Sequence, residues 1–126
     1  MKVPTITTNK QKYFLQYLTI INPILLRLSP MQLKVFAGIL YWNNELKQHP
    51  IDLRNRILFS SATKKVIRES IIEGDKVMGE GNFNNLIKEL RRKKLINGKG
   101  SETILNNIFA IYPDKDLTLT INWKIE

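Results

Sequence analysis

Amide and basic side chains alternate with large apolar ones between positions 82 and 94, in a pattern that separates onto two faces of a helix. At about 100° per residue, four apolar residues fall together and must face a core: Phe83, Leu86, Ile87 and Leu90. The opposite face and one flank then carry the hydrogen-bonding side chains, which are Asn84, Asn85, Lys88, Arg91 and Arg92.

These side chains have the chemistry of nucleic-acid recognition. An Asn amide can pair bidentately with adenine, and Arg or Lys with guanine, in the major groove of DNA. Because the first turns of such a helix approach the bases, we predict that Asn84, Asn85 and Lys88 read bases. The phosphate contacts are predicted further along the helix, at Arg91, Arg92 and Lys93.

Basic residues outside this segment extend the same predicted surface. Lys64, Lys65 and Arg68 lie on the preceding predicted helix, where they would hold the nucleic-acid backbone. Lys99 lies in a Gly-containing turn and would enter the minor groove or touch a phosphate. The 126-residue chain has a net charge of +9, and residues 82–100 hold six bases against one acid. This distribution is typical of a surface that binds a polyanion, with a solvated helix face as the alternative.

The sequence offers little for catalysis or metal binding. Its one histidine, His49, precedes Pro50 and has no evident partner for acid–base chemistry. The acids between residues 69 and 80 lack the spacing of a calcium loop, and residues 98–101 fail the pattern of a phosphate loop. The absence of cysteine excludes a thiol nucleophile and cysteine-ligated zinc. We therefore predict that the protein is not an enzyme and has no catalytic residue, metal ligand or cofactor.

The elements that would position these side chains follow from apolar periodicity, caps and turn residues. Helices are predicted over residues 10–21, 29–46, from 60 or 61 to about 72, and 82–94. Asn22-Pro23 should end the first helix, and Ser29-Pro30 should begin the second. Strands are predicted over residues 57–59, 95–96, 103–112 and 117–125, with turns over 73–81 and 97–102. Residues 1–9 are predicted to be an extended arm.

Apolar positions on these helices predict the core. The first helix has a wide apolar arc around Phe14, Leu18 and Ile21, so it must be buried in its own fold or against a partner. On the third helix, the residues predicted to face the core are Val66, Ile67, Ile71 and Ile72.

Two stretches carry a resemblance to a known family. The first runs from residue 59 to 67, FSSATKKVI, and the second from 81 to 96, GNFNNLIKELRRKKLI. The second resembles the recognition helix and first wing strand of winged helix-turn-helix DNA-binding proteins, with Lys94 where those proteins often have Gly. Shorter motifs at residues 21–23, 28–30 and 105–109 add a similarity to the small members of this family encoded by tailed phages and plasmids.

The resemblance covers about residues 20 to 112 and implies an α+β fold. That fold is a winged helix-turn-helix of three to four helices, a small antiparallel β wing and a C-terminal strand. Residues 1–22 would form an N-terminal arm and helix, and residues 23–126 the winged-helix domain, in a single domain overall. The turn between the two helices of this motif is usually three or four residues, and the turn predicted over 73–81 is longer.

The function predicted from these features is DNA binding by a phage or plasmid regulator of transcription, with residues 82–94 in the major groove. The partner would be double-stranded DNA, and a homodimer formed through the first helix would supply two such helices. The alternative is a non-enzymatic structural or adaptor component that contacts other virion or replication proteins through the same scaffold. A third option is RNA binding by the basic face.

The expected location is the cytoplasm of a bacterial host, or the virion in the structural alternative. The N-terminus lacks the apolar core of a signal peptide. The most apolar stretch, residues 15–28, is interrupted by polar residues and proline, so no membrane contact is predicted.

Overall fold

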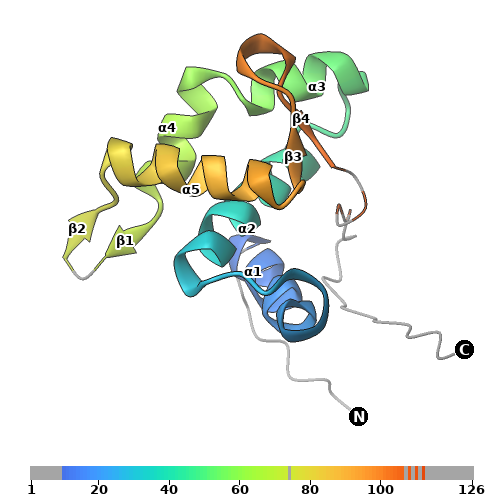
Figure 1. Cartoon of the computed structure of the whole chain (residues 1–126). Helices are drawn as coiled ribbons and strands as arrows, with labels where there is room; N and C mark the ends of the chain where they lie inside the picture. The colour runs from blue at the N-terminus through green and yellow to red at the C-terminus, as the bar shows by residue number, and fades with distance from the viewer. Residues whose placement is uncertain (1–9, 74, 107, 109, 111, 113–126) are drawn as a thin grey trace, which may run out of the picture.

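The fold is mostly helical with two small antiparallel sheets, an α+β arrangement, over the residues that the computed structural model describes: 10–73, 75–106, 108, 110 and 112. The elements in chain order are α1 (Lys10–Ile21), a π-helical turn (Asn22–Leu26), α2 (Pro30–Glu45), α3 (Ile51–Leu58), α4 (Ser61–Glu69), β1 (Ile72–Glu73), β2 (Lys76–Val77), α5 (Glu80–Arg92), β3 (Ile96–Asn97), a 3-10 turn (Gly100–Glu102) and β4 (Ile104–Leu105) (Figure 1). The described part therefore has five α-helices, more than the three to four expected.

Helix α2 is the centre of the packing, because it contacts each of the other four α-helices. Its side chains Val35, Phe36 and Leu40 are fully buried. The same core extends from Phe14 in α1 to Leu105 in β4. Burying a side chain of this size contributes about 1.5–3 kcal/mol, so α2 is the main anchor for the helices around it.

The predicted start of α2 is confirmed in detail. The Ser29 side chain accepts a hydrogen bond from the Gln32 backbone N–H (3.2 Å), and the Gln32 side chain accepts one from the Ser29 N–H (3.0 Å). Pro30 occupies the first turn, where its missing N–H costs nothing. Two N–H groups that the helix leaves without partners are thus satisfied by residues adjacent in sequence.

Helix α1 has the predicted bounds, but Asn22 and Pro23 do not end the helical conformation. The chain continues as a π-helical turn to Leu26 and stops at Arg27, which is left-handed at φ 52°. The Asn22 side-chain amide then bonds to both backbone groups of Leu28, at 2.6 Å and 3.0 Å. This amide closes the connection to α2, which explains why the break lies five residues beyond the prediction.

The strand predicted over residues 57–59 is wrong, because these residues end α3 and form its C-cap at Phe59. An apolar run of three residues has no measurable period, so it does not distinguish a strand from a buried helical turn. In the structure, Asn55 and Leu58 face the core at helical spacing.

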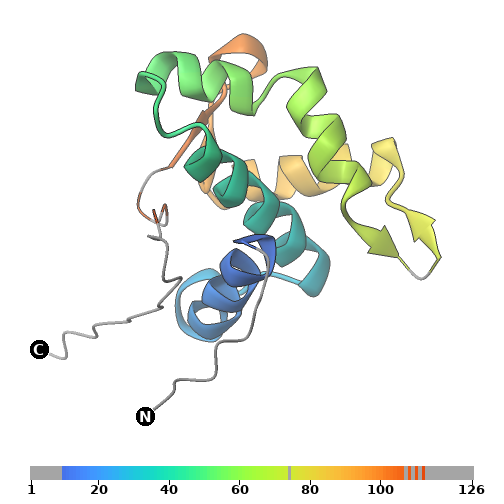
Figure 2. The same cartoon turned by 180° about the vertical axis from the view of Figure 1, so that it is seen from behind.

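The turn predicted over residues 73–81 contains a hairpin instead. Strands β1 and β2 pair in the register Ile72↔Val77 and Glu73↔Lys76, and the hairpin projects past α4 and α5 (Figures 1 and 2). Met78, directly after it, is fully buried, and its N–H donates to the Ile71 carbonyl (3.0 Å). The extra residues in this turn therefore form a structured projection that is tied to the core at its base.

Two residues at this end of α4 have the opposite exposure from the prediction. Ile67 and Ile71 are buried as expected, but Val66 is 46% exposed and Ile72 is 58% exposed. The α-helix ends at Glu69, so Ile72 lies in β1 and no longer follows the helical face of Ile67.

The C-terminal hairpin is confirmed, but its second strand is shorter than predicted. Strands β3 and β4 pair antiparallel with Ile96↔Leu105, and the strand predicted over residues 103–112 is limited to Ile104–Leu105. The Asn106 side chain accepts a hydrogen bond from the Ile108 N–H (3.2 Å), which is an Asx turn that ends the strand. The predicted arm over residues 1–9 and strand over 117–125 lie outside the described residues.

Within the described residues, no single helix is long and apolar enough to cross a membrane. The segments Lys12–Leu26 and Pro30–Glu45 pass that test only when taken together, as a pair bent by 119°.

We expect Gly38→Ala to destabilise the protein. A Cβ at Gly38 would lie 2.8 Å from Cγ2 of Ile67, a buried β-branched side chain with little room to move. Overpacking costs about 1–3 kcal/mol, which outweighs the roughly 0.5–1 kcal/mol that Ala gains over Gly inside a helix. Urea unfolding followed by circular dichroism measures the difference.

The matched control is Gly81→Ala on α5, where a Cβ would meet nothing within 4 Å. This variant should raise the free energy of unfolding by roughly 0.5 kcal/mol. Equal effects of the two substitutions would contradict the close contact between α2 and α4.

Candidate nucleic-acid interface

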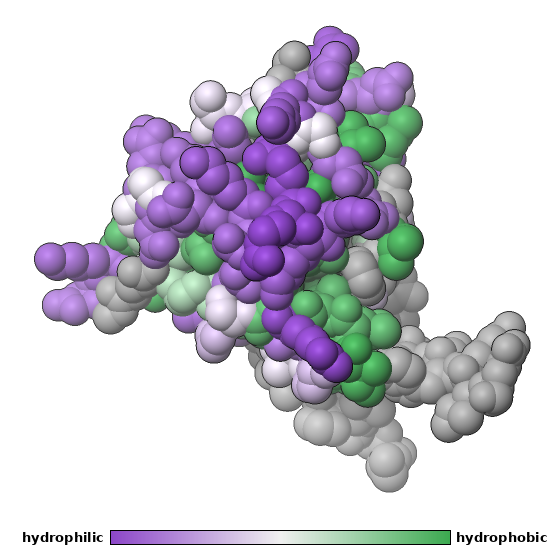
Figure 3. Space-filling view, in the orientation of Figure 1, coloured by the Kyte–Doolittle hydropathy of each residue, from purple (hydrophilic) through white to green (hydrophobic). Residues whose placement is uncertain are grey.

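Helix α5 has the two faces that the sequence predicts. It runs over Glu80–Arg92, beginning and ending two residues before the predicted bounds. Its inner face is buried at Phe83, Ile87 and Leu90, and Leu86 is half-buried. With these side chains held in the core, the opposite side of the helix is fixed toward solvent, where hydrophilic residues dominate the surface (Figure 3).

The three residues predicted to read bases lie together on this outer side. Asn84, Asn85 and Lys88 are exposed and have no hydrogen bond or ion pair within the described part of the chain. A side chain without a partner in the fold breaks no contact within the protein when a ligand binds it, and gives up only its hydration and conformational freedom. Asn84, Asn85 and Lys88 are therefore the part of the predicted site that is open to a ligand.

The three basic residues that follow are already engaged. Nε of Arg91 donates to the Gly98 carbonyl (2.7 Å), and Nζ of Lys93 donates to the Arg27 carbonyl (2.7 Å). Arg92 forms an ion pair with Glu89, with Nη2 2.5 Å from Oε2. Arg91 and Lys93 thus join α5 to neighbouring segments, and their positive charge stays at the surface while part of their hydrogen-bonding capacity is used.

The end of α5 keeps the geometry that a glycine usually supplies. Lys94 adopts the left-handed conformation at φ 63°. Its N–H donates to the Arg91 carbonyl, and the Leu95 N–H donates to the Leu90 carbonyl, both at 3.0 Å. This pair of hydrogen bonds is a Schellman motif, and the buried Leu90 and Leu95 supply its apolar contact. The chain therefore turns sharply into β3 although Lys replaces Gly.

The cations of α4 also differ in whether they have partners within the fold. Nη1 of Arg68 donates to the Met78 carbonyl (2.9 Å), which ties α4 to the base of the β1–β2 hairpin. Lys65 lies 4.0 Å from Glu69, and both side chains are half-exposed or more. Lys64 is half-buried. A hollow of about 480 Å³ separates α4 from the start of α5, lined by Ser61, Lys64, Lys65, Arg68, Glu80, Phe83 and Asn84.

Lys64 also lines a second hollow, of about 310 Å³, between the α3–α4 corner and the β3–β4 turn. Arg56 of α3 lines it as well and is exposed. Arg56 is not among the contacts predicted from the sequence, because it lies beside the residues that were expected to form a strand. The helical period of α3, with Asn55 and Leu58 turned inward, is the signal that would have placed Arg56 on the outside.

The β3–β4 turn places the last predicted contact, Lys99, in an exposed position. Gly98 is left-handed at φ 79°, and a Cβ there would collide with the Glu102 carbonyl oxygen, so only glycine fits. The turn is held from one side by Arg91. From the other side, the buried side chain of Asn55 accepts a hydrogen bond from the Leu105 N–H of β4 (3.0 Å).

Burial raises the pKa of the Tyr17 phenol above its ordinary value, and Tyr17 lies on α1, an element that contributes no residue to this interface. No group of three His, Cys, Asp or Glu residues is placed to hold a metal ion in the described part of the chain.

No family model, no curated protein and no solved structure matches this chain.

We expect Lys94→Gly to stabilise the protein by about 1 kcal/mol, because glycine adopts the left-handed conformation without the cost of a Cβ. Thermal unfolding followed by circular dichroism would show this as a higher midpoint. Lys94→Ala removes the same charge but keeps the Cβ, so it should leave stability nearly unchanged. A rise in both variants would attribute the effect to charge and contradict the backbone explanation.

Proposed function

We propose that this protein binds double-stranded DNA as a winged helix-turn-helix, with α5 in the major groove. The observation that carries the proposal is the unpartnered set Asn84, Asn85 and Lys88, exposed on a helix whose other face is fixed in the core. Amide and ammonium groups in this arrangement have the donors and acceptors that base edges require.

The order of elements supports this assignment. Helix α4, helix α5 and the β3–β4 hairpin follow one another as do the first helix, recognition helix and wing of the motif. The chain departs from the motif in two places. The β1–β2 hairpin replaces the short turn, and α3 lies where a further strand would pair with the wing. Asn55 compensates for that missing strand by accepting from the Leu105 N–H.

The residues of this surface take different roles in the proposal. Asn84, Asn85 and Lys88 read bases, and the residues that meet phosphates are Arg56, Lys64, Lys65 and Lys99. The remaining predicted cations, Arg68, Arg91, Arg92 and Lys93, add positive potential and hold the surrounding segments in place. The positive charge of the whole surface attracts DNA, and Asn84, Asn85 and Lys88 make the specific contacts with bases.

The biological role that fits best is a phage or plasmid regulator in a bacterial cytoplasm, on the resemblance of residues 59–67 and 81–96 to such proteins. The second candidate is a structural or adaptor component of a virion or replication assembly. The observation that favours the second is the pair of exposed apolar residues in the π-helical turn after α1, where Ile24 is 64% and Leu25 53% exposed.

We expect Lys88→Ala to weaken duplex binding by about 1–3 kcal/mol, roughly 5- to 150-fold, because the ammonium group has no other partner. Fluorescence anisotropy of a labelled duplex at two salt concentrations measures the change. Lys47→Ala is the matched control, since it removes the same charge from the exposed connection between α2 and α3. Equal losses in the two variants, or no wild-type binding at low salt, would reject the proposal.

We expect Glu89→Gln to tighten duplex binding at low salt by a few-fold, with a smaller gain at high salt. Glu89 is the one acid between residues 82 and 100, and its carboxylate neutralises Arg92. Glutamine keeps the shape and removes the charge, which leaves Arg92 free for a phosphate. Asp52→Asn on α3 is the control, and its effect on affinity should be small. Unchanged or weaker binding by Glu89→Gln would show that this face does not meet DNA.

A further inference from the structure

The β1–β2 hairpin presents an apolar pair to solvent. Ile72 and Val77 are direct partners in its register, so both side chains lie on the same face of the hairpin. Ile72 is 58% and Val77 48% exposed. A two-stranded hairpin of this size has little stability of its own, and about half of each of these two side chains is open to solvent.

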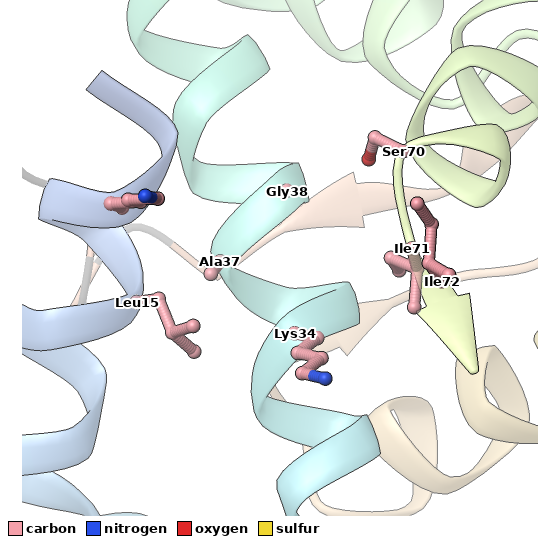
Figure 4. Close-up of a pocket in the computed structure, with 8 residues that line it drawn as sticks. Leu15, Lys34, Ala37, Gly38, Ser70, Ile71 and Ile72 are labelled. Atoms are coloured by element: carbon pink, nitrogen blue, oxygen red, sulfur yellow. The ribbon is translucent and has the colours of Figure 1, made fainter. Parts of the chain in front are cut away.

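The same face continues into a hollow of about 390 Å³ on the other side of the molecule from α5's solvent face. Helix α2 forms its floor at Ala37 and Gly38, Leu15 of α1 lies on one side, and Ile71 and Ile72 lie on the other (Figure 4). Ile72 thus belongs both to the projecting hairpin and to the recessed groove. The two features form one continuous surface with a projection next to a recess.

Charges of opposite sign lie on the two parts of this surface. Lys34 lines the groove, and Asp75 lies in the hairpin turn. Both are exposed, and neither has a hydrogen bond or ion pair within the described residues. The projection therefore has an apolar pair and a net charge of −1 from Glu73, Asp75 and Lys76, and the recess is apolar with Lys12 and Lys34 in its lining.

We propose that this surface is a two-fold interface between two copies of the chain, in which the hairpin of each copy docks in the groove of the other. A two-fold interface requires a patch that is complementary to itself, with each contact made twice. Here the apolar pair on the hairpin of one copy would meet the apolar lining of its partner's groove, and Asp75 would pair with Lys34. A partner of different sequence would need to supply both a projection and a recess of its own.

The proposal can be tested on the full chain without DNA, so its outcome is independent of the proposed function. Sedimentation velocity over a concentration series should show a reversible dimer. The double variant Ile72→Thr with Val77→Thr should weaken association by about tenfold or more, because it removes apolar area and keeps β-branched side chains. Since both positions are exposed, the circular dichroism spectrum should not change.

Two controls separate this interface from other apolar surfaces. Ile104→Thr changes a strand residue of similar exposure, 46%, on β4, and should leave the dimer intact. Ile24→Thr changes an exposed residue of the π-helical turn after α1, and should also leave the dimer intact. A dimer that is lost with Ile24→Thr and kept with the hairpin variant would overturn the proposal, as would a wild-type protein that stays monomeric at every concentration.

A charge exchange tests the predicted register. Lys34→Glu and Asp75→Lys should each weaken the dimer, because each places like charges in contact across the interface. The double variant restores opposite charges and should recover association. Weakening that adds in the double variant would show that these residues do not face each other.

Discussion

The close approach of α4 to α2 is the contact on which the rest of the candidate site depends. Ile67 is the one buried residue of α4, and its Cγ2 lies only 2.8 Å from the place that a Cβ on residue 38 would take. A glycine in the middle of a helix costs about 0.5–1 kcal/mol, so its presence in α2 is explained by the space it leaves. Because α4 lies this deep, Arg68 reaches the Met78 carbonyl, and the hairpin and the start of α5 follow from that position.

Three long cationic side chains connect neighbouring segments of this small fold. Arg68, Arg91 and Lys93 each donate to a backbone carbonyl of another segment, at 2.7–2.9 Å. A charged donor makes a stronger hydrogen bond than a neutral one. The long Arg and Lys side chains also reach segments that the core does not join. The same cations raise the positive surface potential, so under the proposed function the residues that hold the fold together would also attract a polyanion.

The sequence predicts the parts of the fold that depend on local chemistry. The helix at 10–21, the Ser29 cap and the two faces of α5 all follow from residues a few positions apart. The errors occur at residues 57–59, 73–81 and 103–112, where elements are short and their ends depend on contacts from elsewhere. In the candidate site, the exposure of Asn84, Asn85 and Lys88 follows from helical period alone. The engagement of Lys93 by Arg27, 66 positions earlier, has no local signal.

The hairpin and α5 are mechanically linked, which connects the two proposals without making either depend on the other. Only Met78 and Gly79 separate β2 from α5, and Met78 is fully buried while Gly79 is the N-cap of the helix. A dimer held at the hairpins would therefore hold the two α5 N-termini at a set separation. Two-fold DNA-binding dimers need such rigidity, since their half-sites lie about 34–36 Å apart, one helical turn. If both proposals hold, the residues between α4 and α5 would determine the spacing of the two α5 helices on DNA.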